Sequence, residues 1–345
     1  MNLSDEFLKA TDIKDNSGRT NYRDDIMAFI QKETQKAEET RKARFLSLSP
    51  EERLAEFIKM QGFPLTEYDE YRALPVNAQI TELGTDAEKV ATKMILEVIP
   101  GVRLYGILYR PADNPNKKRP FAIVQHGAND GPEIIGDLVN SANYNHIGRR
   151  LLSRGITVFA PQYLTWEPSV YGSPYDRGKI NSALIQLGGS FSAFELLCGR
   201  RILDYFEKQP FVDEQKMGYV GLSWGGMYAL NMAALDCRLK VTLSACFFND
   251  RSEFNWSDWA HNNQANELFD AELAYMALPR YLCLECGKND PLFLGKSALK
   301  EYEKLCSYLQ GEKFKDRVFF NLFDGVHEFN PADDGLNWFI EKLLG

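Results

Sequence analysis

A serine set between two glycines is the residue of this chain whose surroundings point most clearly to chemistry. The segment Tyr219–Gly226 contains the pattern G-x-S-x-G, with Gly221, Ser223 and Gly225 in the three fixed places. The residues before Ser223 can form a strand, and Met227–Leu235 is rich in good helix formers. A serine at such a strand-to-helix turn projects its hydroxyl out of the backbone. We therefore expect Ser223 to be a nucleophile; the alternative is a glycine-rich turn with a hydrogen-bonded serine.

A serine hydroxyl becomes a useful nucleophile only when a base takes its proton. Four histidines are present, which narrows the search: His126, His146, His261 and His327. His327 follows the apolar segment Val318–Phe323 and an Asp324–Gly325 turn, and an amphipathic segment, Gly335–Leu344, closes the chain. This order predicts that His327 is the base; the alternative is a solvated loop histidine.

The base must in turn be oriented by a third group, usually a carboxylate. Asp290 lies three residues beyond the apolar segment Tyr281–Gly287, which reads as a buried strand. Two other acids compete with it. Asp324 is too close in sequence to His327 to be the usual partner, and Glu285 should point into or across the strand. Asp290 is therefore the predicted acid.

Attack on a carbonyl places negative charge on its oxygen, so two backbone donors should point at that position. One is expected to be the N–H of Trp224, immediately after the nucleophile. An apolar segment over residues 121–125 runs into His126–Gly127, and we expect the N–H of Ala128 to be the second donor. His126 and Gly127 would then border the substrate pocket, with His126 in a structural role. The alternative is a plain turn.

Two segments, 162–190 and 247–279, are longer than a sheet requires and are rich in aromatic residues. Both follow expected strands on the carboxyl side of the sheet, where ligands of α/β proteins bind. Trp166, Trp256 and Trp259 are therefore predicted to line the substrate pocket, where their faces could stack on a sugar or an aryl group. The alternative is that these side chains form a small satellite core.

Alternating strand and helix signals after residue 118 predict a mostly parallel sheet flanked by helices. Residues 71–110 read instead as antiparallel strands around a Pro100–Gly101 turn. Residues 1–70 are charge-rich and helical in character, with a capping box that starts at Ser49. This N-terminal helical extension is expected to pack on the core. The alternatives are an arm that joins two copies of the chain into a homo-oligomer, or a flap over the active site.

Together these motifs resemble the α/β-hydrolase superfamily, and above all its dienelactone-hydrolase-like and acetyl-xylan-esterase-like branch. The matching segments are Leu104–Pro111, His126–Gly127, Gly155–Pro161, Arg201–Asp204, Val212–Asp213, Gly221–Gly226, Gly287–Asp290 and His327–Phe329. The resemblance covers roughly residues 90–345. It implies an α/β-hydrolase fold and divides the chain into the extension, 1–70, and a catalytic domain, 71–345.

The resemblance also implies a function, which is hydrolysis of a carboxylic ester by a Ser–Asp–His triad through an acyl-enzyme. Dienelactone hydrolases carry Cys at the nucleophile, whereas this chain has Ser223, and that difference favours ester chemistry. A short acyl group, acetyl, on a bulky or sugar alcohol is the expected substrate. The same triad serves peptidases, thioesterases and hydrolases of C–C bonds, and a binding protein without activity can retain the fold.

Bulk composition excludes other classes of protein. The net charge of −8 argues against a nucleic-acid partner, and no segment has the length of a transmembrane helix. A serine route needs neither metal nor cofactor. Cys198, Cys237 and Cys246 lie in apolar contexts that predict core positions, while Cys283 and Cys286 should point to opposite faces of one strand. This usage of cysteine suits a reducing cytoplasm.

Overall fold

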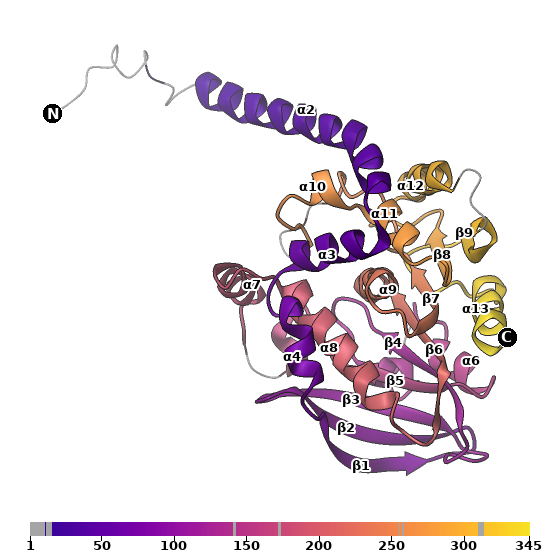
Figure 1. Cartoon of the computed structure of the whole chain (residues 1–345). Coiled ribbons are helices and arrows are strands. Elements are labelled where there is room, and N and C mark those ends of the chain that lie inside the picture. The colour runs from indigo at the N-terminus through magenta and orange to yellow at the C-terminus, as the bar shows by residue number, and fades with distance from the viewer. Residues whose placement is uncertain are drawn as a thin grey trace.

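The computed structural model describes residue 11 and residues 16–140, 143–171, 174–254, 256, 259–309 and 314–345. Within these residues the chain forms a nine-stranded sheet with helices on both faces (Figure 1). This confirms the predicted α/β class and the mostly parallel sheet. Parts of the predicted segments lie outside the described residues, namely 1–10 and 12–15 of the extension and 172–173, 255 and 257–258 of the two pocket segments.

The order of the strands in the sheet is β1-β2-β3-β5-β4-β6-β7-β8-β9. The strands are β1 (Asn77–Thr85), β2 (Lys89–Ile99), β3 (Val102–Pro111), β4 (Arg119–Gln125), β5 (Thr157–Pro161), β6 (Val212–Leu222), β7 (Leu239–Ala245), β8 (Tyr281–Gly287) and β9 (Val318–Phe323). The first three pair antiparallel, with the predicted turn between β2 and β3, and β3 also meets β5 antiparallel. From β5 to β9 all neighbours are parallel.

Helices bury the two faces of this sheet in two separate cores. The α-helices are α2 (Ser17–Ser47), α3 (Pro50–Gln61), α4 (Tyr68–Arg72), α5 (Pro132–Ile135), α6 (Ile147–Leu152), α7 (Arg177–Gln186), α8 (Phe191–Phe206), α9 (Trp224–Leu235), α10 (Gln264–Glu267), α11 (Asp270–Met276), α12 (Gly295–Tyr308) and α13 (Asp334–Leu344). Three short 3₁₀ turns are η1 (Leu65–Glu67), η2 (Pro168–Tyr171) and η3 (Lys315–Arg317). One core contains side chains of α3, α8, α9, α11 and α12; the other contains those of α5, α6 and α13.

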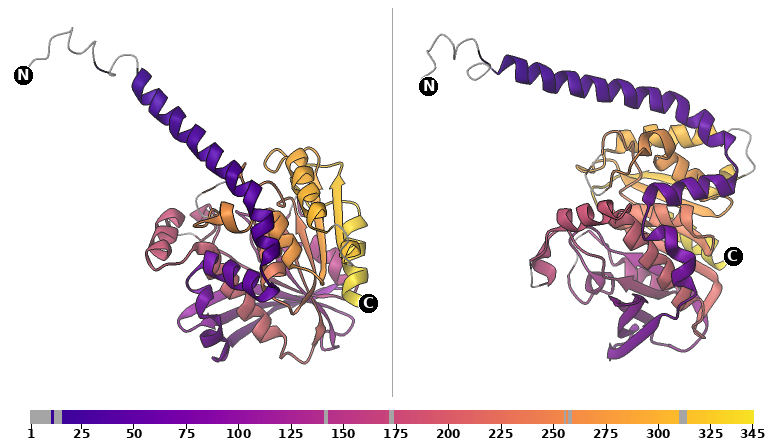
Figure 2. Two further views of the ribbon diagram at one scale, coloured as in Figure 1. Left: turned by 45° about the horizontal axis from the view of Figure 1, so that its top comes forward. Right: turned by 60° about the vertical axis from the view of Figure 1, so that its left-hand side comes forward.

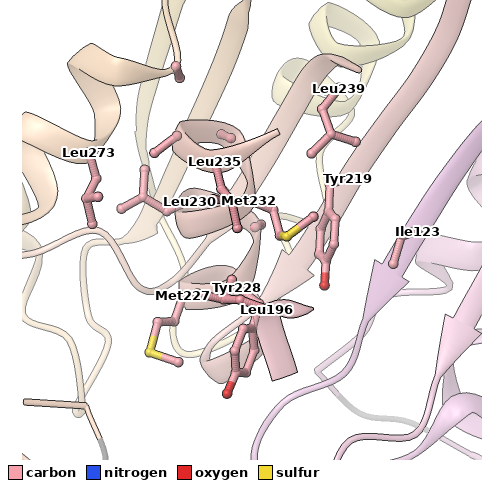
Figure 3. Close-up of a cluster of buried hydrophobic side chains, with 14 of the residues drawn as sticks. Ile123, Leu196, Tyr219, Met227, Tyr228, Leu230, Met232, Leu235, Leu239 and Leu273 are labelled. Carbon is pink, nitrogen blue, oxygen red and sulfur yellow. The ribbon is translucent and has the colours of Figure 1, made fainter. Parts of the chain in front are cut away.

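Helix α9 is enclosed on all sides. Every one of its residues is buried, as expected for a helix that is apolar around its whole circumference. It packs on β6 and β7 and against α8 and α11. Figure 3 shows Leu230 of α9 beside Leu273 of α11, in the cluster that also holds Met227 of α9 and Tyr219 of β6. The tight packing of this helix fixes the turn that precedes it, where Ser223 lies.

The N-terminal helices differ in how they meet the body. Helix α3 begins with the predicted capping box, in which the Ser49 hydroxyl accepts from the Glu52 N–H at 3.2 Å and the Glu52 carboxylate accepts from the Ser49 N–H at 2.7 Å. Helix α2 projects away from the body over its first half (Figures 1 and 2). Its buried residues, Ala37, Arg41 and Phe45, are spaced every fourth position along its second half.

All six cysteines are free thiols. Cys283 and Cys286 lie in the two cores on opposite faces of the sheet, as the alternation of a strand predicts. The prediction that Cys237 lies in the core is wrong: its side chain is exposed, because it sits in the short loop between α9 and β7. Among the described residues, none of the helices combines the length and apolar character needed to cross a bilayer.

Candidate active site

Ser223 occupies the turn between β6 and α9 with backbone angles φ 59° and ψ −121°. A positive φ is unfavourable for a residue with a side chain, so the surrounding structure must hold it. The flanking glycines make this turn possible. A Cβ on Gly221 would lie 2.0 Å from the Gly225 carbonyl oxygen, and one on Gly225 would lie 2.3 Å from that of Gln125. A side chain at either position would collide with the backbone, so the G-x-S-x-G pattern requires glycine at both places.

Asp290 and His327 are in direct contact. The Nδ1 atom of His327 lies 2.7 Å from Oδ2 of Asp290, whose other oxygen accepts from the backbone N–H groups of Leu292 at 2.8 Å and Phe293 at 3.0 Å. An ionised carboxylate can only accept, so Nδ1 of the imidazole carries the hydrogen. The Asp290 side chain is fully enclosed, whereas that of His327 is 17% exposed. Nε2 is thereby left as the nitrogen that can accept a proton.

The topology of the sheet explains why these residues gather at one edge. Strands β6, β7, β8 and β9 are consecutive parallel neighbours, so their carboxyl ends lie together. Ser223 directly follows β6, Asp290 follows β8 by three residues and His327 follows β9 by four. All three candidate residues therefore belong to the carboxyl edge of the sheet, where ligands of α/β proteins bind.

A thiol at the same edge was missed as a site residue by the sequence analysis. Cys246 directly follows β7, and its Sγ lies 3.2 Å from the carbonyl oxygen of Glu328 and 3.6 Å from that of Val326, the two neighbours of His327. Burial raises the pKa of this thiol, so it remains protonated and can donate. One signal in the sequence could have identified Cys246. It directly follows an apolar strand segment that lies, along the chain, between the strands that precede Ser223 and Asp290.

Cys246, Asp290 and His327 each place a ligand atom within 4.8 Å of the others, close enough in principle to share a metal ion. Two observations fit a metal poorly. The imidazole and the carboxylate already bond each other, and a thiol held in its protonated form is a weak ligand, since the thiolate is the species that binds metals. The arrangement suits proton transfer better.

The loop that follows β4 lies beside Ser223. Gln125 at the end of β4 pairs with Gly221 of β6, and a Cβ on Gly127 would lie 3.7 Å from that of Ser223. The N–H of Gly127 already donates to the Tyr144 hydroxyl at 2.6 Å. The N–H groups of Ala128 and Trp224 remain the two predicted donors to a developing oxyanion.

His126 is completely buried and has a structural place. Its Nδ1–H donates to the Gly127 carbonyl at 2.6 Å, and its Nε2 accepts from the Tyr163 N–H at 3.1 Å. Burial lowers its pKa to about 4, so the ring is neutral near pH 7. It ties the loop after β4 to the start of segment 162–190. With no exposed surface, it shapes the backbone of the predicted pocket and does not itself line it.

The two aromatic-rich segments converge near His327. Trp166 of the first packs edge-on against Trp256 and Trp259 of the second, with ring centroids 5.5 and 5.8 Å apart. Trp259 stacks at 6.0 Å on Phe293, which itself stacks at 5.7 Å on His327. Trp256 is 38% exposed and Trp259 only 2%. The cluster is therefore a packed satellite core, the second alternative drawn from the sequence. Trp256 is its solvent-facing member and keeps a surface that a substrate could contact.

A large hollow lies away from these residues. A cavity of about 950 Å³ separates the first half of α2 from residues 251–269. Its lining includes Met27, Ile30, Arg251, Phe254 and His261, but not Ser223, Asp290 or His327. The candidate reactive groups lie instead at the carboxyl edge of the sheet, where a hydrogen bond joins His327 to Asp290.

The order of the strands and the order Ser, Asp, His along the chain are those of the α/β-hydrolases, and the protein is an enzyme of this class, a carboxylic ester hydrolase. Within the class, residues 111–265 match the model of the dienelactone hydrolase family. This match confirms the resemblance to the branch expected from the sequence. No curated protein matches the chain.

Solved structures share the fold at low sequence identity. A methylesterase, BT1017, superposes with a TM-score of 0.65 at 20% identity, over 88% of this chain and 67% of that one. A glucuronoyl esterase from Solibacter usitatus superposes with a TM-score of 0.61 at 14% identity, over 86% of this chain and 92% of that one. Acetyl xylan esterase 1 from Thermoanaerobacterium sp. JW/SL YS485 superposes with a TM-score of 0.55 at 17% identity, over 84% of this chain and 98% of that one.

Proposed function

We propose that this protein hydrolyses an ester with a short acyl group, acetyl, on a sugar or another bulky alcohol, through a serine acyl-enzyme. The observation that carries the proposal is the 2.7 Å contact between Nδ1 of His327 and Asp290. It fixes the imidazole in the tautomer whose Nε2 is free, at the sheet edge where the turn after β6 presents Ser223.

In this mechanism the Ser223 oxygen attacks the ester carbonyl while Nε2 of His327 takes the hydroxyl proton. The N–H groups of Trp224 and Ala128 hold the oxyanion of the tetrahedral intermediate. Its collapse breaks the bond to the alcohol, which leaves with the proton returned by His327. Water then attacks the acyl-enzyme with the same imidazole as base, and Asp290 stays ionised and stabilises the imidazolium in both halves.

Two observations support a short acyl group and a bulky alcohol. Ser223 is only 9% exposed, which limits the room beside its hydroxyl. The solvent-facing ring of Trp256 belongs to the aromatic cluster that reaches His327 through Phe293, and an aromatic face of this kind can stack on a sugar ring. The similar structures include proteins named acetyl xylan esterase and glucuronoyl esterase, which supports a carbohydrate ester as substrate.

The Trp224 ring does not contribute to such a platform. Its indole is fully buried beneath the turn, with the Arg177 guanidinium 4.4 Å from the ring centre. Only its backbone N–H is expected to meet the substrate. Trp256 is therefore the aromatic residue whose replacement should change the binding of the alcohol part of the substrate.

The test is relative kcat/KM for acetyl, butyryl and octanoyl esters of one alcohol, together with acetylated and methyl-esterified sugars. We expect acetyl to exceed octanoyl by at least tenfold, which is about 1.4 kcal/mol of transition-state preference. Trp256→Ala should raise KM for acetylated sugars and leave that for a small acetyl ester unchanged. A tenfold preference for octanoyl would contradict the short acyl group. A preference for methyl esters of sugar acids would place the sugar on the acyl side instead.

A further inference from the structure

The first half of helix α2 carries an unusual concentration of exposed apolar side chains. Five large ones fall within two and a half turns and expose between 41% and 71% of their surface: Tyr22, Ile26, Met27, Phe29 and Ile30. Every residue from Asn16 to Lys32 is exposed, and the first buried position of the helix is Ala37. Exposed apolar patches of this kind mark surfaces that bind a partner.

This half of the helix also stands away from the body of the protein (Figure 2). Between the two lies the cavity of about 950 Å³, with Met27 and Ile30 on the helix side and Phe254 on the other. Most helices of a protein are stabilised by packing of an apolar face. Here the second half of α2 is packed, through Arg41 on Glu272 and Phe269, while the first half has its apolar side chains in solvent.

We propose that the first half of α2 is the contact surface for a second copy of this chain, with the two α2 helices packed antiparallel about a twofold axis near Ala28. The sequence of the helix is complementary to itself in this arrangement. Positions 26 and 30 are symmetric about 28, so Ile26 faces Ile30 of the other copy. Positions 23 and 33 are symmetric as well, so Arg23 meets Glu33.

These four residues also share one face of the helix. Arg23, Ile26, Ile30 and Glu33 follow one another at spacings of three, four and three, which keeps side chains on one side of an α-helix. Arg23 now contacts Asp24, and Glu33 contacts Lys36, in exposed pairs of the same helix. Exposed ion pairs of this kind contribute little to stability. Replacing them by ion pairs between two copies of the chain therefore costs little free energy. A twofold interface requires this kind of self-complementary surface.

The size of the patch suits a dimer better than a membrane. A stable interface buries roughly 800 Å² on each partner, and the rings of Tyr22 and Phe29 alone expose roughly 100 Å² each. Helices that lie on membranes carry an excess of Lys and Arg on the polar face. The segment 17–33 instead has equal numbers of the two signs: Arg19, Arg23 and Lys32 against Asp24, Asp25 and Glu33.

Sedimentation velocity of the full chain, over concentrations from about 1 to 100 μM, tests the proposal. The wild-type chain should sediment as a dimer, and the double variant Ile26→Glu/Ile30→Glu as a monomer, because it places four charges in an apolar contact. The matched control is Ile185→Glu/Leu187→Glu, which replaces two side chains near the end of α7 that are 58% and 65% exposed, against 41% and 48% for Ile26 and Ile30, and it should remain dimeric. Far-UV circular dichroism establishes that α2 remains helical.

A charge exchange tests the antiparallel register. Arg23→Glu alone and Glu33→Arg alone should each weaken the dimer several-fold, whereas Arg23→Glu/Glu33→Arg should restore it, because the two partners then meet with signs reversed. A wild-type chain that is monomeric at the highest concentration would overturn the proposal. So would a dimer that survives Ile26→Glu/Ile30→Glu, or a monomer that sediments with phosphatidylcholine–phosphatidylglycerol vesicles through α2. These results do not depend on the proposed ester chemistry.

Discussion

Phe293 contacts both His327 and Asp290, the residue hydrogen-bonded to that imidazole. Its ring stacks on the imidazole of His327 with centroids 5.7 Å apart and planes inclined by 24°. Its backbone N–H donates to Asp290 at 3.0 Å. One residue therefore contacts both the imidazole of His327 and the carboxyl group of Asp290, and it connects both to the aromatic cluster.

Replacement of Phe293 by Leu should lower kcat by about 3-fold to 10-fold, because aromatic contacts of this kind contribute about 0.5–1.5 kcal/mol. The backbone donor to Asp290 remains, so the loss should be partial. Steady-state kinetics on a small acetyl ester gives the result. Phe319→Leu is the control, since it removes a similar stack, on Trp338, from another part of the sheet. Equal losses in both variants would show a general loss of stability rather than a role of Phe293 at the site.

Asp290→Asn should lower kcat by about 10⁴, because an amide can donate to Nδ1 and so favours the wrong tautomer of His327. Asp324→Asn provides the comparison, since Asp324 is a carboxylate three residues before His327 and is exposed. It should retain near wild-type turnover. The assignment of the acid fails if Asp324→Asn is the more damaging change.

Cys246→Ala should reduce kcat by about 5-fold with little change in KM, since the thiol holds the backbone on both sides of His327 and does not meet the substrate. Cys246→Ser should recover part of the loss, because a hydroxyl can donate to the same carbonyls. Cys237→Ala, which removes an exposed thiol, should have no effect. A fully active Cys246→Ala protein would exclude this positioning role.

Stability should fall as the pH rises from about 6.5 to 8. Burial raises the pKa of Glu301 to about 8 and that of Asp270 to about 7, whereas carboxyls of an unfolded chain titrate near pH 4. The folded state therefore binds more protons than the unfolded state in this window, and its advantage is lost as the pH rises through the folded pKa values. His126, whose pKa is lowered to about 4, makes the free energy of unfolding rise with pH instead, and only below about pH 6.5.

Glu301→Gln should flatten this dependence. Urea unfolding at several pH values between 6.5 and 8 measures it, and the free energy of unfolding of the variant should fall less steeply than that of the wild type. Glu303→Gln, on an exposed position of the same helix, should follow the wild type. Parallel slopes for Glu301→Gln and the wild type would show that Glu301 does not titrate in this window.

Local patterns were enough to predict the elements that carry the candidate site residues. The G-x-S-x-G turn, the acid after an apolar strand and the histidine before the last helix each depend on residues close in sequence. The same is true of the β2–β3 hairpin and of the capping box at Ser49. In each case one short segment contains both the signal and the structure that it specifies.

Features that depend on the order of strands in space could not be predicted. Cys246 and Phe293 reach His327 only because β7 and β8 lie between β6 and β9, which no local pattern states. Trp256 and Trp259 lie in one irregular segment without periodicity, so nothing in the sequence indicated that Trp256 faces solvent and Trp259 the core. Cys237 lies between the charged residues Asp236 and Arg238, which mark the loop that the prediction overlooked.

The central claim is that Ser223 is the nucleophile. The most direct measurement is mass spectrometry of the chain after treatment with a fluorophosphonate, which reacts with activated serines, followed by peptide mapping. One label per chain is expected, on the peptide that contains Ser223, and none on the folded Ser223→Ala protein, whose turnover should also fall by about 10⁴ to 10⁶. A wild-type chain that takes no label, or a Ser223→Ala protein that is labelled and still hydrolyses the ester, would contradict the claim.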